Sequence, residues 1–121
     1  MTELLFNAVA LHGLTSTTLR ASEAPSRVIS GDPEAREMIL HEDGCTEIGI
    51  WEVSRGSFHS SKVGVSEFMY FLSGAGTITR ESGEVIEIRP DVYVSLPDGS
   101  HVVWDVEEPA RKVYVITRTA A

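Results

Sequence analysis

Glu67 is the residue whose type and surroundings point most directly to chemistry. It stands in an otherwise apolar segment, residues 66–72, where Met69 and Phe71 follow it at alternate positions. Alternate residues of a strand share a face, so these side chains are expected to lie together. A buried carboxylate must pair with a cation or metal, accept hydrogen bonds, or take a proton. Glu67 is therefore a candidate for ligand binding or acid–base catalysis, and a solvated carboxylate at a rim is the alternative.

Two histidines, His59 and His101, could add metal chemistry to this carboxylate. Imidazole binds divalent metals and moves protons near neutral pH. Glu67 with both histidines would supply the three ligands that a catalytic metal usually needs, and the protein would then be a metal-dependent enzyme. The alternative is that both histidines lie on the surface or in loops. The residues alone leave open whether the protein is an enzyme.

Regularly spaced turns predict the elements that must position these residues. From Cys45 onward, segments rich in β-branched and aromatic residues alternate with turn signals such as Arg55-Gly56 and Ser82-Gly83, which is typical of an all-β sandwich or barrel. Gly74-Ala75-Gly76 is interpreted as a tight hairpin. The expected strands are residues 47–53, 66–72, 76–81, 84–89, 93–96, 101–106 and 112–117. Residues 11–19 and 27–29 could be further strands, whereas residues 33–40 are ambiguous between helix and strand.

Length and charge restrict the class of protein. The chain has 121 residues, enough for one domain, and a net charge of -8 with no basic cluster, which argues against a nucleic-acid partner. No stretch approaches the roughly 20 apolar residues of a membrane span, and the amino terminus lacks a basic leader pattern. We therefore expect a cytoplasmic protein with no membrane partner. Cys45 is expected to be a small buried residue at the start of a strand.

Two motifs resemble those of the cupin superfamily. In cupins the first motif reads G-x5-H-x-H-x3,4-E-x6-G and the second reads G-x5-P-x-G-x2-H-x3-N, and their three histidines and glutamate typically hold a divalent metal. Glu67 through Gly74 matches E-x6-G, and Pro97 with Gly99 matches P-x-G. The histidine positions do not match: the first pair falls on residues 60–64, which contain no histidine, and the last falls on Val102. One of four expected ligands remains, so no metal cofactor is expected, with a divalent metal as the alternative.

Further anchors resemble a small cupin branch related to the cupin domain of ureidoglycine aminohydrolase. They are Gly31-Asp32-Pro33, Gly49-Ile50-Trp51-Glu52, Pro97-Asp98-Gly99 with Trp104, and Glu108 through Tyr114. The resemblance implies a single small cupin (double-stranded β-helix or jelly-roll) barrel over residues 1–121. Residues 1–44 would form an amino-terminal extension with edge strands, and residues 45–118 the barrel core. It also implies a homodimer and an extended segment at residues 33–40. Tyr70 and Tyr93 alternate on their strands, where they would face either the other subunit or the second layer.

The same resemblance suggests the composition of the site. Glu67 would point into a mostly apolar cavity with Met69, while Val102 and Trp104 would line the cavity from the second motif. Lys62 stands where two counting registers expect a metal ligand, and we hypothesise that a Lys62–Glu67 ion pair replaces the metal. The alternative is that Lys62 lies in an exposed loop.

Two functions remain open. The first is a metal-free module that binds a small metabolite, such as an amine or ureido compound, on Glu67 and Trp104. Trp51 and Trp104 are large enough to stack on a planar ligand, although core packing is the alternative for both. The second is a metal-dependent, aminohydrolase-like enzyme of nitrogen-compound metabolism. The count of expected metal ligands favours the first.

Overall fold

The computed structural model describes residues 13–119, and the regular structure in this range consists of nine strands. The strands are β1 (Arg20–Ser22), β2 (Val28–Gly31), β3 (Ala35–Glu42), β4 (Thr46–Val53), β5 (Gly56–Ser61), β6 (Val65–Arg80), β7 (Val85–Ile88), β8 (Tyr93–Leu96) and β9 (His101–Arg118). All their pairings are antiparallel. The prediction of an all-β jelly-roll barrel is confirmed. Within the described range, no helix is long and apolar enough to cross a membrane.

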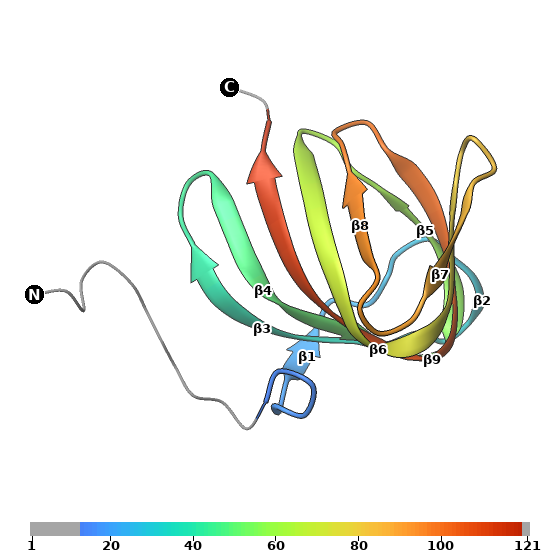
Figure 1. Cartoon of the computed structure of the whole chain (residues 1–121), viewed down its shortest axis with the longest axis horizontal. Coiled ribbons are helices and arrows are strands. Elements are labelled where there is room, and N and C mark those ends of the chain that lie inside the picture. The colour runs from blue at the N-terminus through green and yellow to red at the C-terminus, as the bar shows by residue number, and fades with distance from the viewer. Residues whose placement is uncertain (1–12, 120–121) are drawn as a thin grey trace, which may run out of the picture.

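Two long bent strands, β6 and β9, join the two layers of the barrel. The second half of β9 pairs with β4 and with the first half of β6, whereas its first half pairs with β5 and with the second half of β6. We call β1, β3, β4, β8 and the adjoining halves of β6 and β9 the first sheet. The second sheet contains β2, β5, β7 and the other two halves. Figure 1 shows the strands curling around a common interior.

Glycine allows β6 to bend closely over β9. Gly74 and Gly76 have φ angles of 117° and 147°, which other residues rarely adopt. A Cβ atom on Gly76 would lie 2.2 Å from the carbonyl oxygen of Asp105, and one on Gly74 would lie 2.6 Å from the Cα of Ala110. The predicted hairpin at residues 74–76 is therefore wrong, because these glycines bend one continuous strand instead of reversing the chain.

A hydrophobic core fills most of the space between the sheets. Its largest members include Phe58, Phe71, Ile78, Leu96 and Trp104, and all of them are buried. They come from positions that alternate with half-buried or exposed residues along β5, β6, β8 and β9, as the period of a strand requires. The core supports one side of the functional site described below.

The other sequence predictions are corrected in detail. The predicted strands 101–106 and 112–117 form one strand, β9, which continues through Glu108-Pro109. Residues 35–42 are extended as β3, and residues 28–31 form β2, whereas residues 13–19 contain no strand and residues 11–12 lie outside the described range. The strands β1 and β5 were not predicted. Cys45 is exposed immediately before β4, so the prediction that it is buried is wrong.

Candidate functional site

Glu67 binds both lysines of the chain. Its Oε1 lies 2.6 Å from Nζ of Lys62, and its Oε2 accepts a hydrogen bond of 2.7 Å from Nζ of Lys112. The Glu67 side chain is almost fully buried, that of Lys112 nearly so, and that of Lys62 mostly so. The structure thus contains the hypothesised Lys62–Glu67 ion pair and adds a second ammonium group that the sequence analysis did not foresee.

Strand register brings Glu67 and Lys112 together. Glu67 on β6 pairs with Ile116 of β9, and Lys112 pairs with Trp51 of β4 on one side and Phe71 of β6 on the other. Side chains alternate along β9, so Lys112 points inward while its neighbour Arg111 points to the opposite face. Arg111 there forms an ion pair of 2.7 Å with Glu52. Adjacent basic residues therefore serve different parts of the molecule.

The loop between β5 and β6 carries Lys62 and is held by the turn of the second motif. The Lys62 N–H donates to the carbonyl of Ser100 at 2.9 Å, and its carbonyl accepts from the N–H of Gly99 at 2.7 Å. Gly99 has a φ of 89°, in the region that favours glycine. The Pro97-Asp98-Gly99 turn thus fixes the backbone of the residue that reaches Glu67.

Aromatic rings surround the ammonium group of Lys112. Its Nζ lies 4.6 Å from the ring centroid of Trp51, 5.0 Å from that of Trp104 and 5.9 Å from that of Tyr114. Ring faces attract a cation at these separations, and the attraction is larger where water is excluded. Together with Glu67, the rings hold the lysine side chain in one position.

A cavity of about 260 Å³ opens beside this cluster. Its lining consists of Glu37, Glu47, Trp51, Lys62, Glu67, Lys112, Tyr114 and Ile116. The prediction of a mostly apolar cavity with one carboxylate is therefore wrong, because three carboxylates, two ammonium groups and a phenol face it. The predicted cavity contains only Glu67, its neighbours and residues of the second motif, and it lacks the inward-facing polar residues of β3, β4 and β9.

Tyr114 closes one side of the cavity through Glu47. Its hydroxyl donates a hydrogen bond of 2.6 Å to Glu47 Oε2, and burial together with this carboxylate raises the pKa of the phenol well above its usual value. Gly49 makes room for the ring, since a Cβ atom there would lie 2.7 Å from the Tyr114 hydroxyl and from the Met38 carbonyl oxygen. This close approach gives the Gly-x-Trp-Glu segment a structural reason.

The electrostatics of the cluster favour a charged Glu67 and weaken the hold of Lys112 on its proton. Burial acts to raise the pKa of Glu67, but the two ammonium groups outweigh it and lower the pKa below its ordinary value. Burial is also the main effect on Lys112, whose pKa is lowered; Lys62 adds to this lowering, and Glu67 opposes it. Two ammonium groups thus share one carboxylate, and the second positive charge adds to the lowering of the pKa of Lys112.

The remaining residues predicted to bind a ligand lie behind the cavity wall. Met69, Val102 and Trp104 are at most 2% exposed and belong to the hydrophobic core. Trp104 stacks on Phe58 and meets Trp51 edge to face. Trp51, in contrast, is only partly buried and lines the cavity. The ring available for stacking on a ligand is therefore Trp51.

His59 and His101 form a separate pair. Nδ1 of His59 lies 3.1 Å from Nε2 of His101, whose other ring nitrogen lies 2.8 Å from the hydroxyl of Ser61. They alternate with the buried Phe58 and Val102, so they lie on the opposite face of their strands from Glu67. The structure does not bring these histidines together with Glu67.

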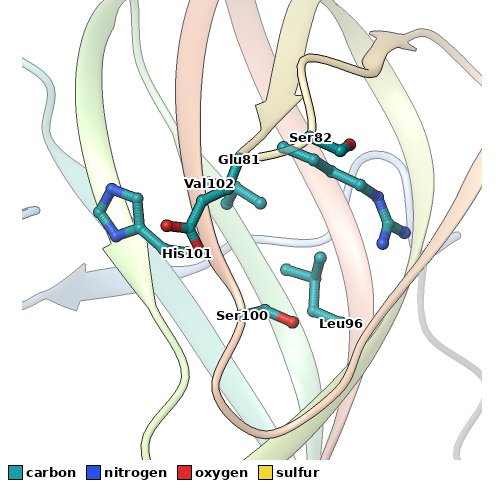
Figure 2. A pocket seen from close by; sticks show the side chains of 7 residues that line it. Glu81, Ser82, Leu96, Ser100, His101 and Val102 are labelled. Carbon is teal, nitrogen blue, oxygen red and sulfur yellow. The ribbon is translucent and has the colours of Figure 1, made fainter.

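His101 borders another pocket, which Figure 2 shows. This pocket lies beside the β6–β7 turn and the loop before β9. The imidazole of His101 points away from Leu96 and Ser100. Its lining consists of Arg80, Glu81, Ser82, Leu96, Ser100, His101 and Val102. The pocket contains neither Glu67 nor either lysine, so it is not connected with the buried charges.

The donor set around Glu67 does not fit the divalent metal that the resemblance would imply. Both carboxylate oxygens are engaged by ammonium groups, and a protonated lysine has no lone pair for a metal. Among residues 13–119, no group of three or more His, Cys, Asp or Glu side chains is placed to share a metal ion.

Lys112, Glu37, Glu47 and Tyr114 are the site residues that the sequence analysis missed. For Lys112 a signal was present: the chain has only two lysines, and this one alternates with Tyr114 and Ile116 in a predicted strand. Glu47 and Trp51 likewise share one face of a predicted strand. For Glu37 no comparable signal existed, because its segment was ambiguous between helix and strand.

Solved structures with the same fold include three informative relatives. A protein of unknown function from Pseudomonas syringae pv. tomato is 24% identical, with a TM-score of 0.76, and the match covers 85% of this chain and 46% of that one. EutQ from Clostridium difficile is 19% identical (TM-score 0.61; 71% and 69% covered), and ectoine synthase from P. lautus is 19% identical (TM-score 0.63; 76% and 68% covered). At these identities the similarity shows the fold alone.

A family model assigns most of the barrel. The model described as the EutQ-like cupin domain matches residues 40–114, which include β4 to β8, most of β9, and both lysines with Glu67. A comparison with curated proteins found no match. The chain spans less than half the length of the Pseudomonas protein. On the family match over more than half of its length, the chain belongs to the EutQ-like cupin domain family.

Proposed function

We propose that this protein binds a small metabolite in the cavity beside Lys62, Glu67 and Lys112, without the metal usual in the fold. The observation that carries the proposal is that each oxygen of Glu67 meets an ammonium group, and that no other lysines exist in the chain. Buried ionic groups of this kind are costly to maintain unless they are well paired, and they concentrate at functional sites. A cavity of about 260 Å³ suits a ligand smaller than a typical drug.

The chemistry of the lining favours a ligand that carries an amine or ureido group. Both oxygens of Glu67 are engaged by buried ammonium groups. Glu47 accepts from Tyr114, and Glu37 accepts from Ser22 and lies 4.0 Å from exposed Arg20. A carboxylate oxygen can accept a further hydrogen bond, so Glu37 and Glu47 are the acceptors proposed for such a group. Trp51 offers a face on which a planar ureido group can stack. This ligand class agrees with the resemblance to the cupin domain of ureidoglycine aminohydrolase, which remains part of the proposal.

A ligand screen tests this function directly. Thermal unfolding would be followed with small amines, amidines and ureido compounds, and we expect one class to raise the melting temperature by mass action. Glu47→Gln should weaken that effect, whereas Glu81→Gln, the same change in the pocket of Figure 2, should not. If both substitutions changed the ligand-induced rise in melting temperature equally, the ligand would not bind in the cavity beside Glu67 and the proposal would be wrong.

The absence of a metal cofactor is part of the same proposal. Elemental analysis of untagged protein purified without chelator should find no transition metal at near-stoichiometric level. A stoichiometric metal that is lost in Glu67→Ala would overturn the proposal. It would revive the alternative of a metal-dependent enzyme of nitrogen-compound metabolism, since Glu67 would then have exchanged its lysines for a metal.

A homodimer is the proposed assembly of the single cupin domain. An aromatic strip on the outer face of the first sheet supports this proposal: Phe68 and Tyr93 stack with ring centroids 5.6 Å apart and are 42% and 65% exposed. Tyr70 beside them donates a hydrogen bond to Asp91. Exposed aromatic patches commonly mark interfaces between proteins. Light scattering should give twice the mass of one chain for the wild type and the mass of a single chain for Tyr93→Lys.

A further inference from the structure

We propose that Lys112 is a nucleophile that joins a small aldehyde or ketone as an imine within the cavity. This inference rests on the proposed function, because it uses the same cavity and adds a covalent step. Nζ of Lys112 lines the cavity, lies 2.7 Å from a carboxylate oxygen that can take its proton, and is held among aromatic rings. Imine formation needs an amine held in position, a proton acceptor next to it and a site from which water is partly excluded, and Lys112 has all three.

Lys112 is better suited to this role than Lys62. An amine becomes nucleophilic at neutral pH when it is desolvated or lies next to another cation, and both conditions hold for Lys112. Its side chain is 7% exposed against 16% for Lys62, and burial with the nearby Lys62 charge lowers its pKa. Lys62 lies 2.6 Å from the other oxygen of Glu67 and so keeps this side chain in place while Lys112 reacts.

The groups present can complete the step without another reagent. The Lys112 ammonium gives one proton to Glu67, and the neutral amine attacks the carbonyl carbon. The C–N bond forms, the carbonyl π pair moves to oxygen, and a second nitrogen proton passes to that oxygen. Glu67 then returns its proton to the hydroxyl, which leaves as water, and a protonated imine remains. The net charge is unchanged, and addition of water reverses the reaction.

The chain makes the experiment simple to interpret. Lys62 and Lys112 are the two lysines of this sequence, so side-chain adducts can form at two positions. The protein would be incubated near pH 7 with acetaldehyde or pyruvate and with sodium cyanoborohydride, which reduces an imine to a stable amine. Peptide mapping by mass spectrometry should show Lys112 labelled severalfold faster than Lys62, because the Lys112 amine is the more buried of the two and lies among aromatic rings. Equal labelling, or no label on Lys112, would overturn the proposal.

Two controls separate folded-state activation from general reactivity. Lys112→Arg keeps the charge beside Glu67 and should lose only the Lys112 adduct, whereas Glu81→Gln, in the separate pocket of Figure 2, should keep it. In urea, wild-type protein should label both lysines equally, and this measurement does not depend on any variant folding. A preference for Lys112 that persists in urea would contradict the proposal, since local sequence would then be its cause.

The outcome also distinguishes the covalent step from the proposed binding function. If an amine or ureido compound raises the melting temperature through Glu47 but Lys112 stays unlabelled, the imine proposal fails and the binding function stands. If Lys112 is labelled selectively while no such compound binds, the imine proposal stands and the proposed ligand class is wrong.

Discussion

The inner faces of the two sheets differ in what they bury. The second sheet contributes apolar side chains, such as Phe58, Ile78 and Trp104, to the hydrophobic core, and Trp104 also lies against the ammonium group of Lys112. The first sheet buries Glu67 and Lys112 at equivalent inward positions, and Lys62 reaches them from the loop after β5. Along β4 the inward residues change from Glu47 through Trp51 to Val53 within a single strand. Strand alternation thus decides that a side chain is inward, but the partners available decide whether a charge can be kept there.

Of the substitutions considered, removing Glu67 alone should lower the free energy of unfolding most, because it breaks the buried charge cluster that distinguishes the first sheet from the second. Glu67→Leu would leave two buried ammonium groups without a counter-charge, and the free energy of unfolding should fall by about 3–5 kcal/mol. Denaturant titration would measure it. In the matched variant, Lys62→Met and Lys112→Met accompany Glu67→Leu, and most of the loss should disappear because the first sheet then resembles the second. A triple variant as unstable as the single one would contradict this explanation.

Acid should break the same contacts in the unmodified protein. The pKa of Glu67 is lower in the folded state than its ordinary value of 4.5, because the ammonium groups of Lys112 and Lys62 outweigh burial. The corresponding stability is fully present above pH 4.5 and is lost as the pH falls through the folded-state value. Denaturant titrations at decreasing pH should show a steeper loss for the wild type than for the triple apolar variant. Parallel curves would mean that other carboxylates dominate acid unfolding.

Replacing Lys62 should have a smaller effect than replacing Glu67. In Lys62→Met the carboxylate keeps its hydrogen bond to Lys112, so the expected loss is that of one charged hydrogen bond, about 1.5–3 kcal/mol. Ligand binding should also weaken, because Lys62 lines the cavity. Calorimetry and denaturant titration on the same samples would measure both quantities. Unchanged values for both would remove Lys62 from the site.

A conservative change in the second sheet supplies the opposite control. Ile78→Val removes one buried methylene group from the apolar core and should cost about 0.5–1.5 kcal/mol. Ligand affinity and the labelling of Lys112 should stay unchanged, since Ile78 does not line the cavity. A clear loss of binding would show that the two sheets are mechanically coupled.

The histidine pair should contribute least. His59→Gln keeps a polar side chain next to His101 and should change the free energy of unfolding by no more than about 1 kcal/mol. Ligand binding and metal content should both be unaffected, because the pair lies on the opposite face of its strands from Glu67. Loss of a bound metal in this variant would instead restore the histidines to the functional site.

Local patterns predict the strands better than they predict where the strands join. Alternation located β4, β7 and β8, but Gly74 and Gly76 were interpreted as a turn because a flexible pair looks the same whether the chain reverses or bends. The bend is recognised from the structure, in which Asp105 and Ala110 of β9 pack closely against Gly76 and Gly74.

For the site, the residue pattern contains an isolated carboxylate in an apolar strand, two lysines, and motif positions without their usual histidines. The regular turns and the motif resemblance predict the barrel, and the motif positions suggest that Glu67 pairs with Lys62. The folded chain adds that Lys112 completes the cluster, that Glu37 and Glu47 line the cavity, and that Val102 and Trp104 lie behind its wall. Glu67 and Lys112 are 45 residues apart in the chain. Their contact depends on the register between β6 and β9, and register comes from the packing of whole sheets, so no local pattern in either segment contains it.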